Sequence, residues 1–144
     1  MSRAQLPFTL LGEGDFRAAM DTACKTWRES CVSETDCNSF DGTRLHAYYA
    51  VPEEARACIV MLHGFCEFFG KYHEMAWYFY RAGFSFYFLE QRGHGKSSGK
   101  LDEADIVYVD DFGTYVKDLR IFLDRVVLPA EKSRKKRAFV HMCG

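Results

Sequence analysis

Continuous apolar runs alternate with amphipathic stretches over much of the chain. The runs cover residues 57–62, 84–89 and 138–143, and each has the length of a strand. Continuous runs are typical of strands in parallel sheets, which are buried on both faces. The stretches between them, at 72–79 and 112–126, carry apolar residues at helical spacing. This alternation predicts an α/β fold with a mostly parallel sheet.

The two amphipathic stretches each predict a helix with one apolar face. The apolar positions of the first helix are Tyr72, Met75, Ala76 and Phe79. Those of the second helix are Phe112, Tyr115, Val116, Leu119, Phe122, Leu123 and Val126. Because residues three and four apart share a helix face, we expect both sets to pack against the sheet. Gly83 is expected to end the first helix and Pro129 to end the second.

A helix and a hairpin are predicted before the first apolar run. The apolar positions of the helix, over residues 15–30, are Phe16, Met20, Ala23 and Trp27. The turn dipeptide Asp41-Gly42 then separates 32–40 from 44–51, which predicts a hairpin. We expect this hairpin to form an antiparallel edge of the sheet. No repeat or linker divides the 144 residues, so we expect one domain.

Composition narrows the classes of partner. The net charge of -1 excludes a broad basic surface for nucleic acid, and the single basic run, 132–137, is interpreted as a solvated loop. The six cysteines form no C-x-x-C pair and no zinc-site spacing. No stretch resembles a signal peptide or a membrane span, so a cytoplasmic location is expected. The aromatic content of 16% fits a dense core or an apolar substrate groove.

Glycine-bearing turns follow the three apolar runs. They are His63-Gly64-Phe65, residues 91–95, and the terminal Gly144. In open parallel sheets, ligands bind beyond the carboxyl ends of the strands. We therefore expect the functional residues in these turns.

The motifs in these turns resemble those of a known superfamily. Residues 62–67 are similar to the first strand end of an α/β-hydrolase, and residues 90–97 to its D-x-R-G-x-G-x-S loop. Residues 109–112 and 118–119 resemble the following helix in the lysophospholipase and monoacylglycerol lipase branch, the serine aminopeptidase S33 type. One departure is Glu90, which stands where the family usually has Asp.

The resemblance implies a single incomplete α/β-hydrolase domain over residues 1–144. Residues 1–30 would be a helical extension and residues 31–144 the N-terminal half of the hydrolase core. Gly144 fits the first glycine of the nucleophile motif G-x-S-x-G, so no member of the catalytic triad would be present. We expect a chain truncated at this strand to be inactive. We also expect it to fold poorly, because an apolar strand edge would be open.

The resemblance also implies roles for residues of the turns. The backbone N–H of Phe65 would stabilise the oxyanion of an ester intermediate, and Gly64 would let the chain turn sharply toward the substrate. His63 and Gly93 would support the site, and Arg92 would bridge neighbouring loops with its forked donors. A plain strand-ending turn at His63-Gly64 is the alternative interpretation.

The activity implied by the resemblance is serine hydrolysis of carboxylic esters, with lysophospholipids or monoacylglycerols as substrates. This chemistry needs no metal and no cofactor. The binding partner would be a small lipid or ester substrate. The sequence leaves open both peripheral membrane contact and the oligomeric state. A peptidase or another ester hydrolase of the superfamily is an alternative, because the fold does not fix the substrate. A non-catalytic module that binds a lipid or a protein is a second alternative.

The loop over residues 95–99 contains two motifs that we interpret as decoys. It matches G-x-S-x-G literally, and Ser97, Asp111 and His141 would keep the family's triad order. However, no helix follows Ser97, and His141 lies inside an apolar run. The loop also approaches the phosphate-binding G-x-x-x-x-G-K-S, but Glu90 replaces its first glycine. His94, in the same loop, is interpreted as a scaffold residue rather than a base.

Overall fold

A computed structural model of the chain describes residues 5–99, 107–132 and 140–143. Within these ranges one mixed sheet has the strand order β1-β2-β4-β3-β5. Its strands are β1 (Ser33–Asn38), β2 (Arg44–Ala50), β3 (Ala57–Leu62), β4 (Phe84–Glu90) and β5 (Val140–Cys143). Strand β2 runs antiparallel to β1 and β4, whereas β3 runs parallel to β4 and β5. The predicted α/β fold with an antiparallel N-terminal hairpin is confirmed.

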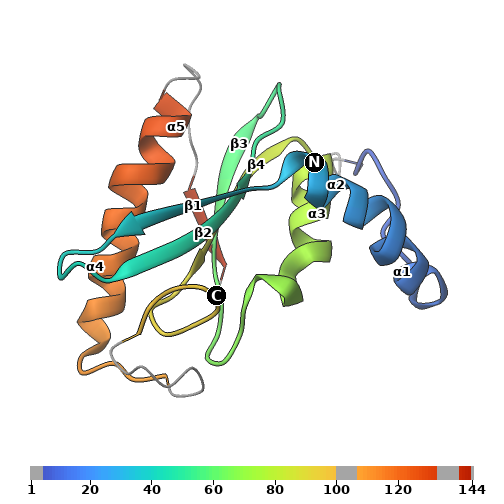
Figure 1. Cartoon of the computed structure of the whole chain (residues 1–144). Helices are drawn as coiled ribbons and strands as arrows, with labels where there is room; N and C mark the ends of the chain where they lie inside the picture. The colour runs from blue at the N-terminus through green and yellow to red at the C-terminus, as the bar shows by residue number, and fades with distance from the viewer. Residues whose placement is uncertain (1–4, 100–106, 133–139, 144) are drawn as a thin grey trace.

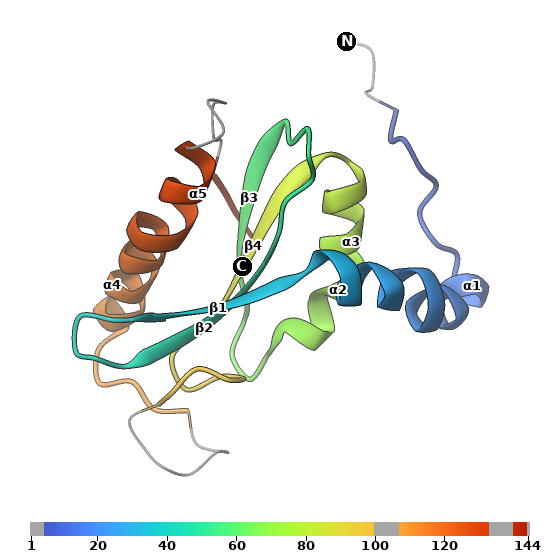
Figure 2. The same cartoon turned by 45° about the horizontal axis from the view of Figure 1, so that its top comes forward.

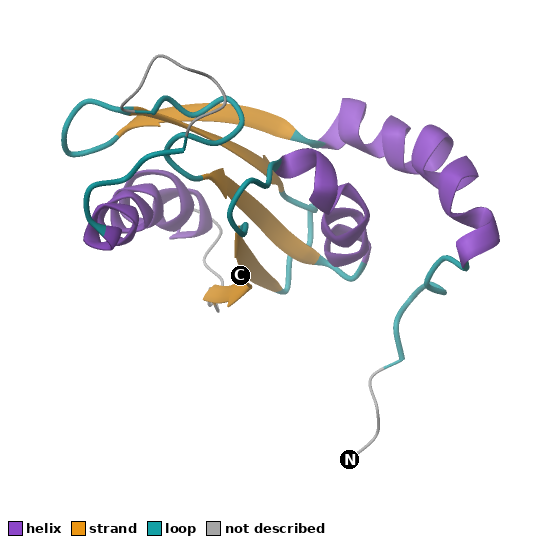
Figure 3. Cartoon of the chain, turned by 90° about the horizontal axis from the view of Figure 1, so that it is seen from below, coloured by secondary structure: helices purple, strands orange, loops and turns teal. Residues whose placement is uncertain are grey.

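Helices cover both faces of the sheet, as Figures 1 and 2 show. The helical elements before β4 are α1 (Glu13–Ala19), the π-helical turn η1 (Met20–Cys24), α2 (Lys25–Cys31), the 3-10 turn η2 (Phe69–Tyr72) and α3 (His73–Arg81). Those after β4 are α4 (Phe112–Phe122), the π-helical turn η3 (Leu123–Val127) and α5 (Leu128–Lys132). Seen from below, α3 and the α4–α5 helix lie on opposite sides of the strands (Figure 3).

Alternate strand residues supply the two halves of the core. Successive side chains of a strand point to opposite faces, so each strand contributes to both halves. On the α3 side the buried strand residues are Ala50, Ile59, Met61, Phe86 and Phe88. On the α4 side they are Leu45, Ala47, Cys58, Val60, Tyr87 and Leu89. Burial on both faces is why β3 and β4 carry continuous apolar runs rather than alternating ones.

Two predicted helix faces are wrong in part. Phe112 and Val116 are exposed on α4, and Met75 is exposed on α3. On α4 the polar residue Asp118 is buried instead, where it pairs with Arg92. Because a buried ion pair must keep its partners in contact, this pair fixes the rotation of α4 about its axis. Apolar spacing alone does not contain that constraint.

The N-terminal helix is confirmed, but its buried face also differs from the prediction. Phe16 and Ala23 are exposed, whereas Cys24 and Trp27 are buried. The π-helical turn η1 lies between the two ends of this helix. A π turn contains an additional residue, so it rotates the following positions relative to a regular 3.6-residue repeat.

Pro129 does not end the helix that begins at Phe112, because α5 continues to Lys132. A proline ring inside a helix clashes with the carbonyl of the residue four positions earlier. The π-helical turn η3 directly precedes α5, and its wider backbone relieves that clash. Gly144 and most of the predicted basic loop, residues 133–137, lie outside the described residues.

Candidate active site

A cavity of about 340 Å³ lies at the carboxyl ends of β3 and β4. Its lining residues are Leu62, His63, Gly64, Phe65, Gln91, His94, Phe112 and Tyr115. Two of the turns identified in the sequence therefore meet at one cavity, together with the start of α4. Phe65 and Phe112 are 74% and 76% exposed, so two large apolar side chains face solvent beside it. Exposed apolar surface of this kind marks a binding region more often than a scaffold.

In the turn after β3 the Phe65 backbone donor lies unpaired between two paired donors. The Gly64 N–H donates to Glu67 Oε2 at 3.0 Å, and the Cys66 N–H donates to His94 Nε2 at 3.2 Å. Between them, the Phe65 N–H has no acceptor among the described residues. Cys66 has a φ of 58°, a left-handed conformation that is strained for a residue with a side chain. The local backbone thus satisfies the neighbouring donors and keeps the Phe65 N–H available at the cavity.

Glu67 connects this turn to the 3-10 turn η2 through its carboxylate. Its carboxylate accepts a hydrogen bond from the Tyr72 hydroxyl as well as from Gly64. The Tyr72 hydroxyl and the Gly64 N–H lower the pKa of Glu67, because both donate to the ionised form. Glu67 belongs to the motif of residues 62–67, but its contact with Tyr72 could not be read from the sequence.

His63 is a buried neutral link between the two turns. Its Nδ1 lies 2.7 Å from the Gly64 oxygen, and its Nε2 accepts the Gln91 N–H at 2.8 Å. Burial lowers the pKa of His63, because the charged imidazolium loses its hydration. Both ring nitrogens are engaged, so the side chain positions the turns rather than exchanging protons with a ligand.

Arg92 ties the turn after β4 to two other elements. Its guanidinium donates to Asp118 on α4 at 2.9 and 3.0 Å. It also donates to Asp41 at 2.6 and 3.1 Å and to Thr43 at 2.8 Å, both in the β1–β2 turn. The bonds from Arg92 hold the pKa of Asp41 well below its usual range. The predicted bridge between loops is therefore present, next to Gly93, whose φ of 78° favours glycine.

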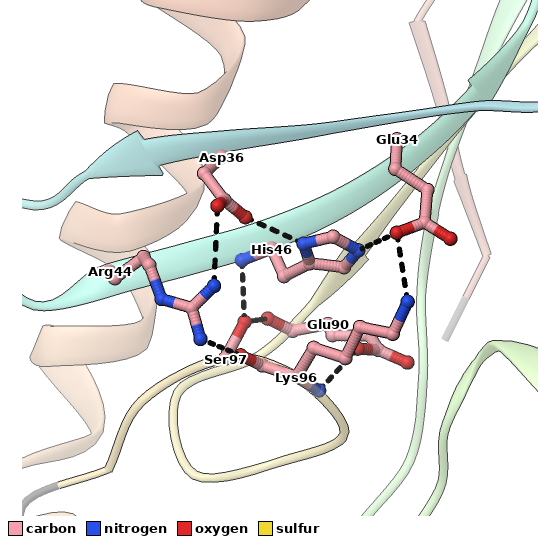
Figure 4. Close-up of polar contacts among 7 residues, drawn as sticks. All are labelled: Glu34, Asp36, Arg44, His46, Glu90, Lys96 and Ser97. Atoms are coloured by element: carbon pink, nitrogen blue, oxygen red, sulfur yellow. Dashed lines mark hydrogen bonds and ion pairs between the residues drawn. The ribbon is translucent and has the colours of Figure 1, made fainter.

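Ser97 is buried and both hydrogen-bonding roles of its hydroxyl are filled (Figure 4). The hydroxyl donates to the Glu90 carbonyl oxygen at 2.5 Å and accepts the His46 N–H at 2.8 Å. Neither partner is a base that could remove a proton from the hydroxyl. Asp111 instead caps α4 by accepting the Gly113 N–H at 2.9 Å. The hydroxyl of this literal G-x-S-x-G motif thus links its loop to the backbones of β4 and β2.

The carboxylate of Glu90 fills the concave side of the same loop. It accepts the Lys96 N–H at 2.7 Å and the Phe69 N–H at 3.2 Å. A Cβ on Gly95 would collide with this carboxyl group, so a larger residue would force Glu90 away from its N–H donors. A phosphate would need the space and the donors that Glu90 occupies, which excludes a phosphate-binding loop. The glutamate in place of the family's aspartate thus has a structural role of its own.

The pairing of Asp118 with Arg92 is the feature of this region that the sequence did not reveal, although residues 118–119 belong to the family motif. Arg92 was identified as a bridge, but its acidic partners were not. A buried arginine needs carboxylate partners. An acidic residue on the core-facing side of a predicted helix therefore indicates such a partner. Asp118 stands three residues after Tyr115 and four before Phe122, both on the predicted apolar face.

In the described part of the chain, no group of three or more histidine, cysteine or acidic side chains has a geometry that could hold a metal ion. No helix over these residues has both the length and the apolar character needed to cross a bilayer.

Comparisons with known proteins agree with the motifs. Residues 53–142, more than half of the chain, match the model of the family described as serine aminopeptidase, S33. A monoacylglycerol lipase of Mycolicibacterium smegmatis is 39% identical over 67 residues, which are 46% of this chain and 22% of the lipase. Lysophospholipase L2 of Escherichia coli is 31% identical over 86 residues, 60% of this chain and 25% of that enzyme. The chain thus spans about a quarter of these relatives.

Solved structures show the same fold. A monoglyceride lipase of Saccharomyces cerevisiae superposes with a TM-score of 0.64 at 17% identity, over 96% of this chain and 39% of the lipase. A carboxyl esterase of Bacillus coagulans gives a TM-score of 0.61 at 24% identity, over 76% of this chain and 35% of the esterase. The sequence motifs, the sheet with its two helical layers and the family match agree. The chain belongs to the serine aminopeptidase S33 family of α/β-hydrolases.

Proposed function

We propose that this protein hydrolyses carboxylic esters of lipids, as a lysophospholipase or monoacylglycerol lipase, by serine acyl-enzyme chemistry. The observation that carries the proposal is the unpaired Phe65 N–H beside an apolar cavity. The names of the two relatives, a monoacylglycerol lipase and a lysophospholipase, support lipid esters over peptides as substrates.

Several residues of the cavity and of its two turns would have a part in this chemistry. The apolar walls at Leu62 and Phe112 would hold acyl carbons. The Phe65 N–H would donate to the carbonyl oxygen as it gains negative charge, and the second donor would come from the residue after the nucleophile. His63 and Arg92 would keep the two turns in place, because a donor must be fixed before charge develops.

We also propose that residues 1–144 do not catalyse by themselves. Ser97 has no base beside it, and the family places its serine two residues after a glycine such as Gly144. In the family's order the acid and the histidine follow that serine along the chain. A peptidase would use the same oxyanion donor, so the choice between ester and amide rests on the substrate assay.

The test separates the backbone N–H of Phe65 from its side chain by comparing two variants that both lose the phenyl ring. Phe65→Pro deletes the backbone N–H, whereas the control Phe65→Ala keeps it. In the complete protein we expect Phe65→Pro to lower kcat for a short-chain monoacylglycerol by about 10²- to 10³-fold, and Phe65→Ala by far less. Thermal unfolding of both variants checks that the fold is kept. Equal kcat values for the two variants would remove Phe65 from the mechanism.

A further inference from the structure

A second cavity of about 320 Å³ lies on the α2–α3 side of the turn after β3. Arg28 of α2 and His73 of α3 line it, together with Tyr48 of β2 and residues 68–70. The first cavity is lined by residues 63–65, so a single loop, residues 63–70, borders both cavities. A ligand that bends around this loop would contact both.

Arg28 presents a cation without an acidic partner. Among the described residues no carboxylate pairs with its guanidinium, and its Nε is buried without a hydrogen-bond acceptor. A buried donor that lacks an acceptor costs free energy, so an unpaired guanidinium at a cavity wall favours an anionic ligand. This differs from Arg92, whose donors are all directed at protein oxygens.

His73 adds a neutral donor to the same wall. Its ring nitrogens have no hydrogen-bond partner in the part of the chain that the structure describes. Burial, with the nearby Arg28 cation, lowers the pKa of His73 to about 4. At neutral pH the ring is therefore uncharged and offers one N–H to a ligand.

The acidic side chains of this cavity are already engaged. Glu34 binds Lys96 Nζ at 2.8 Å and lies 3.1 Å from His46 Nε2, as Figure 4 shows. The bond from Lys96 lowers the pKa of Glu34, so it stays ionised within that pair. Glu90 accepts two backbone N–H groups. The groups left for a ligand are the donors on Arg28 and His73.

We propose that this cavity binds the phosphate group of a ligand, with Arg28 as its bidentate partner and His73 as a second donor. The proposal rests on the proposed ester hydrolysis and narrows its substrate to phosphate-bearing lipids. The ester would lie at the Phe65 N–H and the head-group phosphate at Arg28, on the two sides of the loop over residues 63–70. A neutral monoacylglycerol would use only the first cavity.

The first experiment measures binding without turnover. Glycerol 3-phosphate and glycerol are titrated into wild-type protein, Arg28→Gln and the control Lys25→Gln, which removes an exposed cation from the same helix. We expect Arg28→Gln to weaken glycerol 3-phosphate binding about tenfold, and Lys25→Gln less than twofold. His73→Gln should weaken it several-fold, and serves if Arg28→Gln does not fold. Equal affinity of wild type and Arg28→Gln, or no binding to wild type, overturns the proposal.

The second experiment identifies the source of the phosphate. The ratio of kcat/KM for a lysophospholipid to that for a monoacylglycerol of the same acyl chain is measured in the complete protein. We expect Arg28→Gln to lower this ratio about tenfold through the KM of the lysophospholipid, and Lys25→Gln to leave it within twofold. An unchanged ratio, with phosphate binding lost, would contradict a head-group site and assign the cavity to a free phosphate. If wild type hydrolyses neither lipid, the ester proposal fails while the binding experiment still decides the phosphate site.

Discussion

The turns after β3 and β4 both contain glycine and histidine and both face the first cavity, but they use their hydrogen-bonding groups differently. In the turn after β4 the polar side chains of Glu90, Arg92 and Ser97 are all bonded to groups of the protein itself. The turn after β3 pairs the donors of Gly64 and Cys66 and leaves that of Phe65 free. The aromatic side chain of Phe65 is exposed, whereas the three side chains named in the turn after β4 are buried.

The difference separates a scaffold from a candidate site. Polar side chains that are fully hydrogen-bonded within the protein make a loop rigid, and they have no donor or acceptor left for a ligand. An unpaired donor held by paired neighbours is preorganised for a charge that develops later. The literal nucleophile motif lies in the turn after β4, so motif matching alone would select a serine whose hydroxyl bonds to a backbone carbonyl and a backbone N–H.

The largest effect on stability is expected from removing the Arg92 cation in the turn after β4. Arg92→Ala leaves Asp118 buried without a partner, and we expect a loss of about 3–5 kcal/mol in the free energy of unfolding. The exposed pair of Arg44 with Asp36 gives the control, because Arg44→Ala should cost less than about 1 kcal/mol. Urea denaturation measures both. Similar losses would mean that the turn after β4 is no more constrained than the surface.

A smaller effect is expected at Gly95. Gly95→Ala combines a φ of 53° with a Cβ that meets the Glu90 carboxyl group, which would have to release its two N–H donors. We expect a loss of about 2–3 kcal/mol, the sum of the backbone strain and those hydrogen bonds. Gly42→Ala has a φ of 85° with open space around its Cβ, so it measures the backbone cost alone, about 1 kcal/mol. Thermal unfolding of the two variants compares them, and equal losses would contradict the role of Glu90.

Acid should weaken the fold through its buried neutral histidines. The folded pKa values of His63 and His73 are lowered from the ordinary 6.5, that of His73 to about 4. The unfolded chain therefore binds more protons below pH 6.5, and stability falls as pH falls from 6.5 toward 4. We expect a loss of about 1–2 kcal/mol between pH 7 and pH 5. Chemical denaturation at both pH values measures it, and His73→Gln should flatten the dependence; an unchanged slope would contradict the assignment.

The smallest effect on stability is expected at Phe65. Its side chain is 74% exposed, so Phe65→Ala should change the free energy of unfolding by less than about 0.5 kcal/mol. Leu89 is buried in β4, so Leu89→Ala is the contrast and should lower the free energy of unfolding by about 2–5 kcal/mol. Calorimetry of both variants measures this, and a large loss at Phe65 would show that the turn after β3 is also scaffold.

The order of elements could be predicted because it depends on local pattern. Continuous apolar runs identified β3 and β4, and the Asp41-Gly42 turn identified the hairpin, since both signals lie within a few residues. The faces of the helices could not be predicted in full. The burial of Asp118 depends on its contact with Arg92, 26 residues earlier, and the π-helical turns η1 and η3 rotate the helix faces in a way that a regular 3.6-residue spacing does not show.

The candidate site was predictable in location and only partly in detail. The positions of His63, Gly64, Phe65 and Arg92 followed from the rule that ligands bind beyond strand ends and from the resemblance. The pairing state of each donor did not, because it is set by side chains such as Glu67 and His94 folding back over the turn. The exposure of Phe112 beside the cavity was opposite to its predicted burial.

The most direct test of the contrast between the two turns is fluorophosphonate labelling of the protein isolated from its source, followed by peptide mapping. The probe reacts with a serine activated by a neighbouring base. We expect a label on a serine outside residues 1–144; in recombinant protein the label should be lost after Phe65→Pro and kept after Phe65→Ala. A label on Ser97 would contradict it, because the turn after β4 would then be the site and the turn after β3 the scaffold.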